Sequence, residues 1–133
     1  MSMKRRIINP WTWQDQFAFV QANEISHEKR TLICAGQTSN DEHGVPLFPG
    51  DMAKQIEMAL NNLETVLNAA DFQLSDVMRL TSYTTNMDAF LANYGVFAGR
   101  LTERSCRPAA TLVGVTRLAF PDWLVEIEAT AFK

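Results

Sequence analysis

Two carboxylates and one hydroxyl near the C-terminus are the side chains best suited to chemistry. Glu126 and Glu128 alternate with apolar residues, so a strand there would have one polar and one apolar face. A carboxylic side chain can hold a water molecule or shuttle a proton. Glu126 is therefore either a catalytic group or one of two outward carboxylates on a terminal strand. Thr111 is β-branched, which is typical of a strand residue.

The histidines and cysteines do not form a recognisable site. His27 and His43 lie in polar stretches far from any cysteine pair, so no metal-ligand spacing is present. Cys34 and Cys106 are surrounded by apolar or small residues, and no fixed basic group beside Cys106 would activate it as a nucleophile. We expect no metal, no cofactor and no disulfide.

Size and charge limit the class of protein. A chain of 133 residues is typical of one domain, and with 47% hydrophobic residues it can bury a core of its own. The net charge of −3 argues against nucleic acid as a partner, and we interpret Lys4, Arg5 and Arg6 as a solvated N-terminal arm. No apolar run is long enough to span a bilayer, and without a signal peptide we expect a cytoplasmic protein.

The pattern along the chain predicts alternating strands and helices. Strands are expected at 17–22, 31–37, 77–85, 111–118 and 124–132. The continuous apolar run at 31–37 is typical of a strand buried on both faces. Asp51 should cap an amphipathic helix that continues to about Ala70. A second helix should begin at 86–88, with an apolar stripe formed by Phe90, Leu91, Tyr94, Phe97 and Leu101.

These elements fit an α+β domain spanning residues 1–133. A single sheet with both helices on one face would bury every apolar stripe. The other sheet face would then need cover, which copies of the same chain could supply.

Several short motifs, in order and spacing, resemble the Rid (YjgF) family from about Phe19 onward. They are Ala35-Gly36-Gln37, Gly50-Asp51, Thr81-Ser82-Tyr83-Thr84-Thr85-Asn86-Met87, Pro108-Ala109, Val113-Gly114-Val115, Arg117-Leu118 and Val125-Glu126-Ile127-Glu128-Ala129. The resemblance implies a chorismate-mutase-like fold with one mixed sheet, a homotrimer, and clefts between neighbouring subunits. It also implies hydrolysis of small reactive imines or enamines to carbonyl compounds and ammonia.

The resemblance assigns roles to the residues near Pro108. Active deaminases of the family have an arginine followed by a serine or threonine where this chain has Ala110 and Thr111. The family glutamate that holds water corresponds to Glu126. An imino acid carries a carboxylate, which a guanidinium binds through two parallel hydrogen bonds. Ala110 cannot make that contact, so activity on 2-imino acids should be very weak.

The remaining substrate-binding positions are partly altered. Gly36 matches the family, whereas a serine is replaced by Ala35 and a tyrosine by Phe19. A family asparagine falls at about Tyr94, with Asn93 beside it.

Another arginine could replace the missing one. Arg107 either reaches the rim of the cleft or is a solvated residue in the loop before Pro108. Arg117 should point away from Ala110, because it lies an odd number of residues along a regular strand.

Three functions follow from this comparison. The chain could be a divergent deaminase with Glu126 holding water, while Thr111 and the Gly36 backbone orient the substrate. It could instead be a non-catalytic trimer that binds a small metabolite or acts as a partner protein. RNA cleavage, an activity of some relatives, ranks last because the chain is acidic and lacks a histidine pair.

Overall fold

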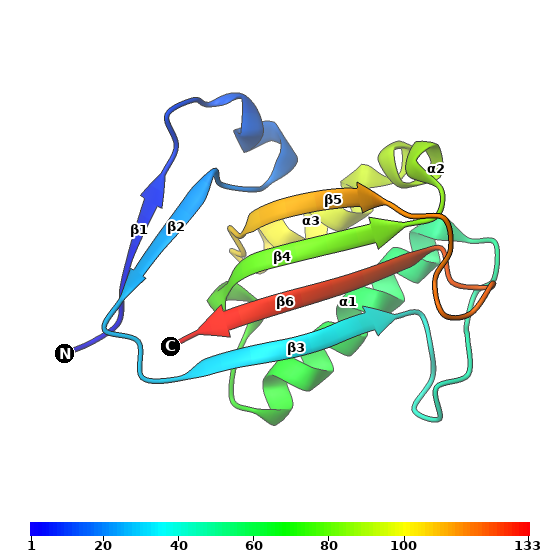
Figure 1. Cartoon of the computed structure of the whole chain (residues 1–133), viewed down its shortest axis with the longest axis horizontal. Coiled ribbons are helices and arrows are strands. Elements are labelled where there is room, and N and C mark those ends of the chain that lie inside the picture. The colour runs from blue at the N-terminus through cyan, green and yellow to red at the C-terminus, as the bar shows by residue number, and fades with distance from the viewer.

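A computed structural model describes all of residues 1–133. Its elements are, in chain order, β1 (Lys4–Ile8), the 3₁₀ helix η1 (Trp13–Phe17), β2 (Ala22–Ser26), β3 (Thr31–Thr38), α1 (Met52–Ala69), the 3₁₀ helix η2 (Leu74–Asp76), β4 (Val77–Thr84), α2 (Met87–Ala92), α3 (Tyr94–Glu103), β5 (Ala109–Gly114) and β6 (Val125–Phe132) (Figure 1). None of the helices is long and apolar enough to cross a membrane.

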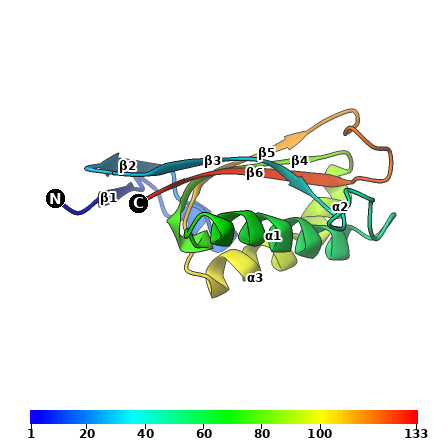
Figure 2. The ribbon, with the colours of Figure 1, turned by 90° about the horizontal axis from the view of Figure 1, so that it is seen from below.

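Four strands form the main sheet in the order β3-β6-β4-β5. The β4–β5 pair is parallel and the other pairs are antiparallel, so the sheet is mixed. A parallel pair needs a crossover connection, which α2 and α3 provide. Figure 2 shows the helices on one face of the sheet and nothing over the other. This confirms the predicted α+β class and the placement of the helices.

Helix α1 forms where the sequence predicts it. The Asp51 side chain accepts a hydrogen bond of 3.1 Å from the Lys54 backbone N–H, which satisfies a free donor of the first turn. One face of the helix is buried against the sheet, including Ile56, Leu60 and Leu63. The helix ends where Asp71 adopts a positive φ of 62°.

The second predicted helix is interrupted. Asn86 caps α2 by accepting from the Ala89 N–H, as expected for its start. At Asn93 the helix breaks: the Asn93 side chain donates to the Ala89 carbonyl, and its backbone N–H is shared between the Ala89 and Phe90 carbonyls. The break turns Leu91 outward to 54% exposure, so its place in the predicted apolar stripe was wrong.

The N-terminal region differs most from the prediction. Residues 17–22 do not form a strand, because the chain leaves η1 through Ala18 in the left-handed region (φ 64°). Val20 makes an isolated bridge to Ala109 of β5, and Ala22 begins the separate strand β2. Lys4, Arg5 and Arg6 lie in β1, which pairs with β2; Lys4 and Arg6 are exposed as expected, but the segment is a strand and not a free arm.

Two strands have different boundaries or surroundings from those expected. β5 ends at Gly114, well short of residue 118. β3 is an edge strand of the chain, and Ile33 is 80% exposed, so the run at 31–37 is not buried on both faces here. β4 and β6 agree with the predicted strands at 77–85 and 124–132.

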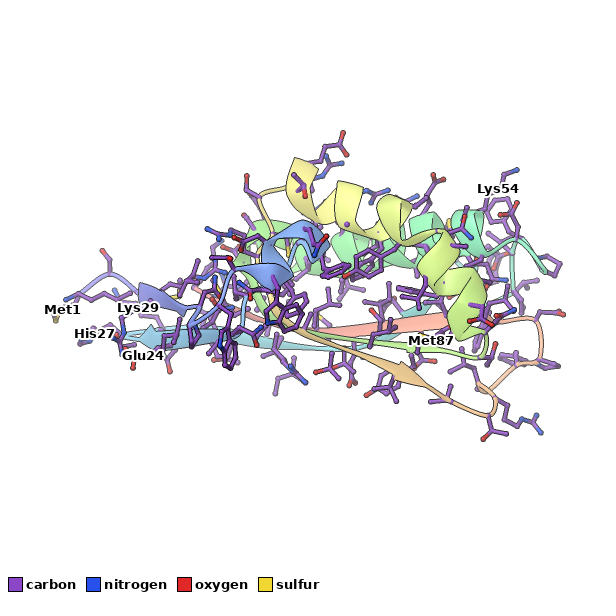
Figure 3. All side chains as sticks on the ribbon, turned by 90° about the horizontal axis from the view of Figure 1, so that it is seen from above. Met1, Glu24, His27, Lys29, Lys54 and Met87 are labelled. Atoms are coloured by element: carbon purple, nitrogen blue, oxygen red, sulfur yellow. The ribbon has the colours of Figure 1, made fainter.

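The uncovered face of the sheet is mostly polar. In Figure 3, where Lys54 and Met87 mark one end of the molecule, side chains project from this face with no helix over them. Along β6, residues such as Glu126 point to this open face, because Val125 and Ile127 are fully buried on the helical side. The sheet thus separates an apolar interior from a polar surface.

Candidate functional site

A cavity of about 210 Å³ lies on the helical side of the sheet, between the edge strand β5 and the helices. Its lining residues are Phe17, Phe19, Ser82, Phe90, Tyr94, Phe97, Ala110, Thr111 and Leu112. Four of the residues predicted as site residues therefore surround one cavity, although they come from three separate parts of the chain.

Aromatic rings form most of the cavity wall. Tyr94 makes edge-to-face contacts with Phe17 and Phe90, with ring centres 5.8 and 6.0 Å apart. The Tyr94 hydroxyl donates to the Phe17 carbonyl over 2.8 Å, which ties η1 to α3. Burial raises the pKa of Tyr94, so the phenol stays neutral. Asn93 does not line the cavity, because its amide is bound to the helix backbone.

Ala110 occupies the cavity wall at the point where the resemblance places an arginine. Its side chain lies on the helical side of β5, opposite Leu80 of β4. Neither Arg107 nor Arg117 lines this cavity. Arg107 lies in the loop before β5, and Arg117 lies beyond the end of the strand, so the alternation argument does not apply to it. The wall contains no cation.

Ser82 is a polar residue of the wall that the sequence did not single out. It is only 2% exposed, and its hydroxyl has no hydrogen-bond partner. Its neighbours across the sheet are Leu112 and Ile127, which offer no side-chain acceptor. The alternation of β4 could have placed Ser82 on the buried face, but its lack of a partner depends on the register with β5 and β6.

The sequence also did not indicate Arg79 as a residue near the site. Its Nη2 donates to the Thr111 hydroxyl over 2.9 Å, and its Nη1 lies 3.4 Å from the Ala109 carbonyl. Arg79 is exposed on the open face of the sheet. The Thr111 hydroxyl is therefore already engaged by a cation at the rim, on the opposite side from the aromatic wall.

A second group of predicted site residues lies on the open face, where β3 meets β6. Gly36 lies against Glu126 so closely that an added Cβ would be 2.1 Å from its Oε2 and 2.8 Å from its Cγ. The β3–β6 pairing is irregular between Cys34 and Gln37, and Ala35 lies within that irregularity, exposed to solvent. Glycine thus allows the close approach of the carboxylate, and a larger residue would force the Glu126 side chain to move.

The two carboxylates of β6 have different partners. Tyr83 donates its hydroxyl to Glu128 over 2.5 Å, and this bond raises the pKa of Tyr83. Glu126 has no such partner in the chain, and burial followed by the charge of Glu128 raises the pKa of its carboxyl. Glu126 is therefore the carboxylate better suited to carry a proton.

Within one chain, the predicted catalytic residues do not meet. Thr111 is on β5 and Glu126 is on β6, with β4 between them. Strand spacing alone separates them by roughly 10 Å. The predicted site residues form two groups, one at the aromatic cavity and one at Ala35, Gly36 and Glu126.

The remaining reactive groups do not form a site. No three His, Cys, Asp or Glu side chains lie close enough together to hold a metal ion. Both cysteines are free and buried. Burial raises the pKa of the Cys106 thiol to about 12 and also raises the pKa of Cys34. Neither thiol is activated as a nucleophile.

Comparison with known proteins gives a consistent family. Residues 16–133 match the family model described as Endoribonuclease L-PSP. A RutC family protein of Pyrococcus horikoshii is 36% identical over 77% of this chain and 79% of its own. The 2-iminobutanoate/2-iminopropanoate deaminase of Escherichia coli is 29% identical over 64% of this chain and 66% of its own. A Rid family protein of Yersinia pestis, whose function is described as unknown, superimposes with a TM-score of 0.87 at 37% identity, covering 97% of this chain and 98% of that one.

Proposed function

Since this chain belongs to the Rid (YjgF) family, also described as Endoribonuclease L-PSP, we propose that it binds and slowly hydrolyses a small reactive imine or enamine in a cleft between two of its copies. The observation that carries the proposal is the position of Ala110, in an aromatic cavity wall without a cation. The cavity is retained, whereas the usual anchor for a substrate carboxylate is absent.

The division of the site residues supports a cleft between copies. Thr111 and Ala110 lie at one end of the sheet order, whereas Gly36 and Glu126 lie toward the other. In the proposed assembly, a second copy packs against β5 so that its Glu126 approaches Thr111 of the first. On the otherwise mostly polar open face, Ile33 is 80% exposed and offers an apolar contact for such an assembly. A homotrimer of this kind also accounts for the apolar run of β3.

The proposed reaction assigns one role to each group. Water held by Glu126 adds to the imine carbon, and the carboxylate takes the water's proton as the carbon–oxygen bond forms. The carbon–nitrogen bond becomes single, and Glu126 returns the proton to nitrogen. Glu126 then takes the proton of the new hydroxyl and passes it to nitrogen, so that the carbonyl forms as the carbon–nitrogen bond breaks and ammonia leaves. A raised pKa suits Glu126 to hold that proton between the two steps.

The reaction on 2-imino acids should be weak. A buried charge-assisted contact that is lost costs on the order of 2–5 kcal/mol, which corresponds to roughly 30- to 4,000-fold. Generating 2-iminopropanoate in situ and following its loss tests this. We expect little acceleration by the wild type and a clear gain in Ala110→Arg. Ala110→Leu adds bulk without charge and should show no gain, and Glu126→Gln should abolish the activity of the Ala110→Arg variant.

Rapid turnover of 2-iminopropanoate by the wild type, undiminished in Ala110→Leu, would contradict the assigned role of Ala110. A folded Ala110→Arg protein without activity would favour the alternative, a non-catalytic trimer that binds a small metabolite. The apolar character of the cavity wall supports this alternative. The ring of Phe19 in that wall makes an edge-to-face contact with Trp13, with ring centres 5.7 Å apart.

A further inference from the structure

The Ser82 hydroxyl is the unsatisfied polar atom of a cavity whose other polar groups are already bound. Its oxygen is buried and has no partner. By contrast, the Thr84 hydroxyl, two residues along the same face of β4, donates to the Leu124 carbonyl over 2.8 Å. The Tyr94 hydroxyl uses its proton on the Phe17 carbonyl. A buried hydroxyl without a partner destabilises a protein, so a ligand that reaches Ser82 would gain a bond that the empty protein lacks.

The other residues that line the cavity disfavour a charged ligand. Its lining residues include no Lys, Arg, Asp, Glu or His. A carboxylate entering it would lose its hydration without gaining a counter-charge, which is strongly unfavourable. Arg79, which donates to the hydroxyl of the lining residue Thr111, is on the open face of the sheet.

The size and shape of the wall suit a ring. The cavity volume is about 210 Å³. An apolar cavity of about 150 Å³ is large enough to bind benzene. The ring pairs of the wall, such as Phe90 and Phe97 at 5.6 Å, are the kind that accept another aromatic ring at their edge or face. There is space for one ring and a short polar substituent.

We propose that this cavity binds an uncharged imine or enamine carrying a ring-sized apolar substituent, with a polar atom of the ligand hydrogen-bonded to Ser82. This inference rests on the proposed function, because it names the substrate class for the same site. The Ser82 hydroxyl can donate to an imine nitrogen or accept from an enamine N–H. Ala110 then leaves room for the apolar substituent instead of an arginine side chain.

Binding of three ring compounds to the full-length protein tests the inference. Benzyl alcohol has a ring and a neutral polar atom, toluene has the ring alone, and benzoate has a ring and a charge. Titration followed by NMR should give the affinity order benzyl alcohol, then toluene, with benzoate weakest. In Ser82→Ala, the affinity for benzyl alcohol should fall about tenfold and that for toluene should not change.

Stability of the unliganded variants separates a binding role from a structural one. Ser82→Ala removes an unsatisfied buried group, so its thermal midpoint should stay the same or rise. Ser39→Ala is the matched control. Ser39 is fully buried, but its hydroxyl donates to the Leu47 carbonyl over 2.7 Å, away from the cavity. Ser39→Ala should lower the midpoint and leave benzyl alcohol binding unchanged.

Three outcomes would overturn the inference. They are the absence of binding by any of the compounds, an unchanged affinity of Ser82→Ala for benzyl alcohol, and benzoate binding as tight as that of benzyl alcohol. In the last case, loss of benzoate binding in Arg79→Gln would identify Arg79 as a relocated anion site.

The two proposals can fail separately. If benzyl alcohol binds through Ser82 but no imine is hydrolysed, the catalytic proposal fails and the ligand class stands. If Ala110→Arg hydrolyses 2-iminopropanoate while the wild type does not bind benzyl alcohol, the ligand class fails and the catalytic proposal stands.

Discussion

The aromatic cavity and the Gly36–Glu126 region belong to the same sheet but differ in what completes them. The cavity lies on the helical side, and one chain supplies its whole wall. The Gly36–Glu126 region lies on the open side, and its carboxylate has no partner within the chain. The proposed binding specificity therefore depends on the fold of a single chain. The proposed chemistry, in contrast, depends on groups that a single chain keeps apart.

The largest expected loss of stability follows from truncating an aromatic ring of the cavity wall that is also part of the core. Phe90 is fully buried, and Phe90→Ala should lower the free energy of unfolding by about 3–5 kcal/mol. Leu91→Ala changes the next residue, which is 54% exposed, and should lower the free energy of unfolding by less than about 0.5 kcal/mol. Urea denaturation of both variants checks this. Equal losses would show that the cavity wall is not part of the core.

The close approach at Gly36 should give the next largest effect. Gly36→Ala places a Cβ where the Glu126 side chain lies, so the free energy of unfolding should fall by about 1–3 kcal/mol. In a Glu126→Ala background the same substitution should be nearly neutral. A double-mutant cycle measures this coupling. Additive losses would mean that the carboxylate does not lie over Gly36.

The pH dependence of stability tests the environment of Glu126. Its pKa is raised in the folded state by burial and by Glu128, above an unfolded value of about 4.3. The folded state holds the proton more tightly, so ionisation of Glu126 destabilises the fold as pH rises through the folded pKa. Glu126→Gln should therefore match the wild type in thermal midpoint near pH 4 and exceed it at neutral pH.

A second variant separates the two causes of the raised Glu126 pKa, which are burial and the charge of Glu128. Glu128→Gln removes the neighbouring charge, so the Glu126 pKa measured by NMR should fall in that variant. A midpoint difference between Glu126→Gln and wild type that is the same at every pH would contradict this account.

The smallest effect is expected at the turn that brings two rings into the cavity. Ala18 has a φ of 64°, a region that glycine adopts without strain. Ala18→Gly should change the free energy of unfolding by less than about 1 kcal/mol, because relief of strain offsets the added freedom of the unfolded chain. Ala18→Val should destabilise by about 1–3 kcal/mol. Equal stability of the two variants would mean that the turn is not fixed in this conformation.

Local signals made much of the fold predictable. The Asp51 cap and the 3.6-residue spacing locate α1, and alternation along β6 places Glu126 and Glu128 on one face. Strand β1 escaped prediction because its Lys-Arg-Arg start carries no strand signal of its own. It forms through pairing with β2, whose residues are distant in the chain.

The site was less predictable than the fold, because its contacts depend on register. The resemblance led to Phe19, Tyr94 and Ala110, which line one cavity. The contacts of Ser82 and Arg79 depend on the parallel pairing of β4 with β5, which places Ser82 beside Leu112. No local pattern specifies that register, since a helical crossover separates the two strands.

The burial of the two thiols has a practical consequence for studying assembly. With a pKa of about 12, Cys106 is ionised to the extent of roughly one part in 10⁵ at neutral pH, and Cys34 is also buried. A cysteine introduced at exposed Glu103 would therefore take up a maleimide spin label while both native thiols stay unreacted. Distances between labels on neighbouring copies could then be measured without first removing a residue of the core.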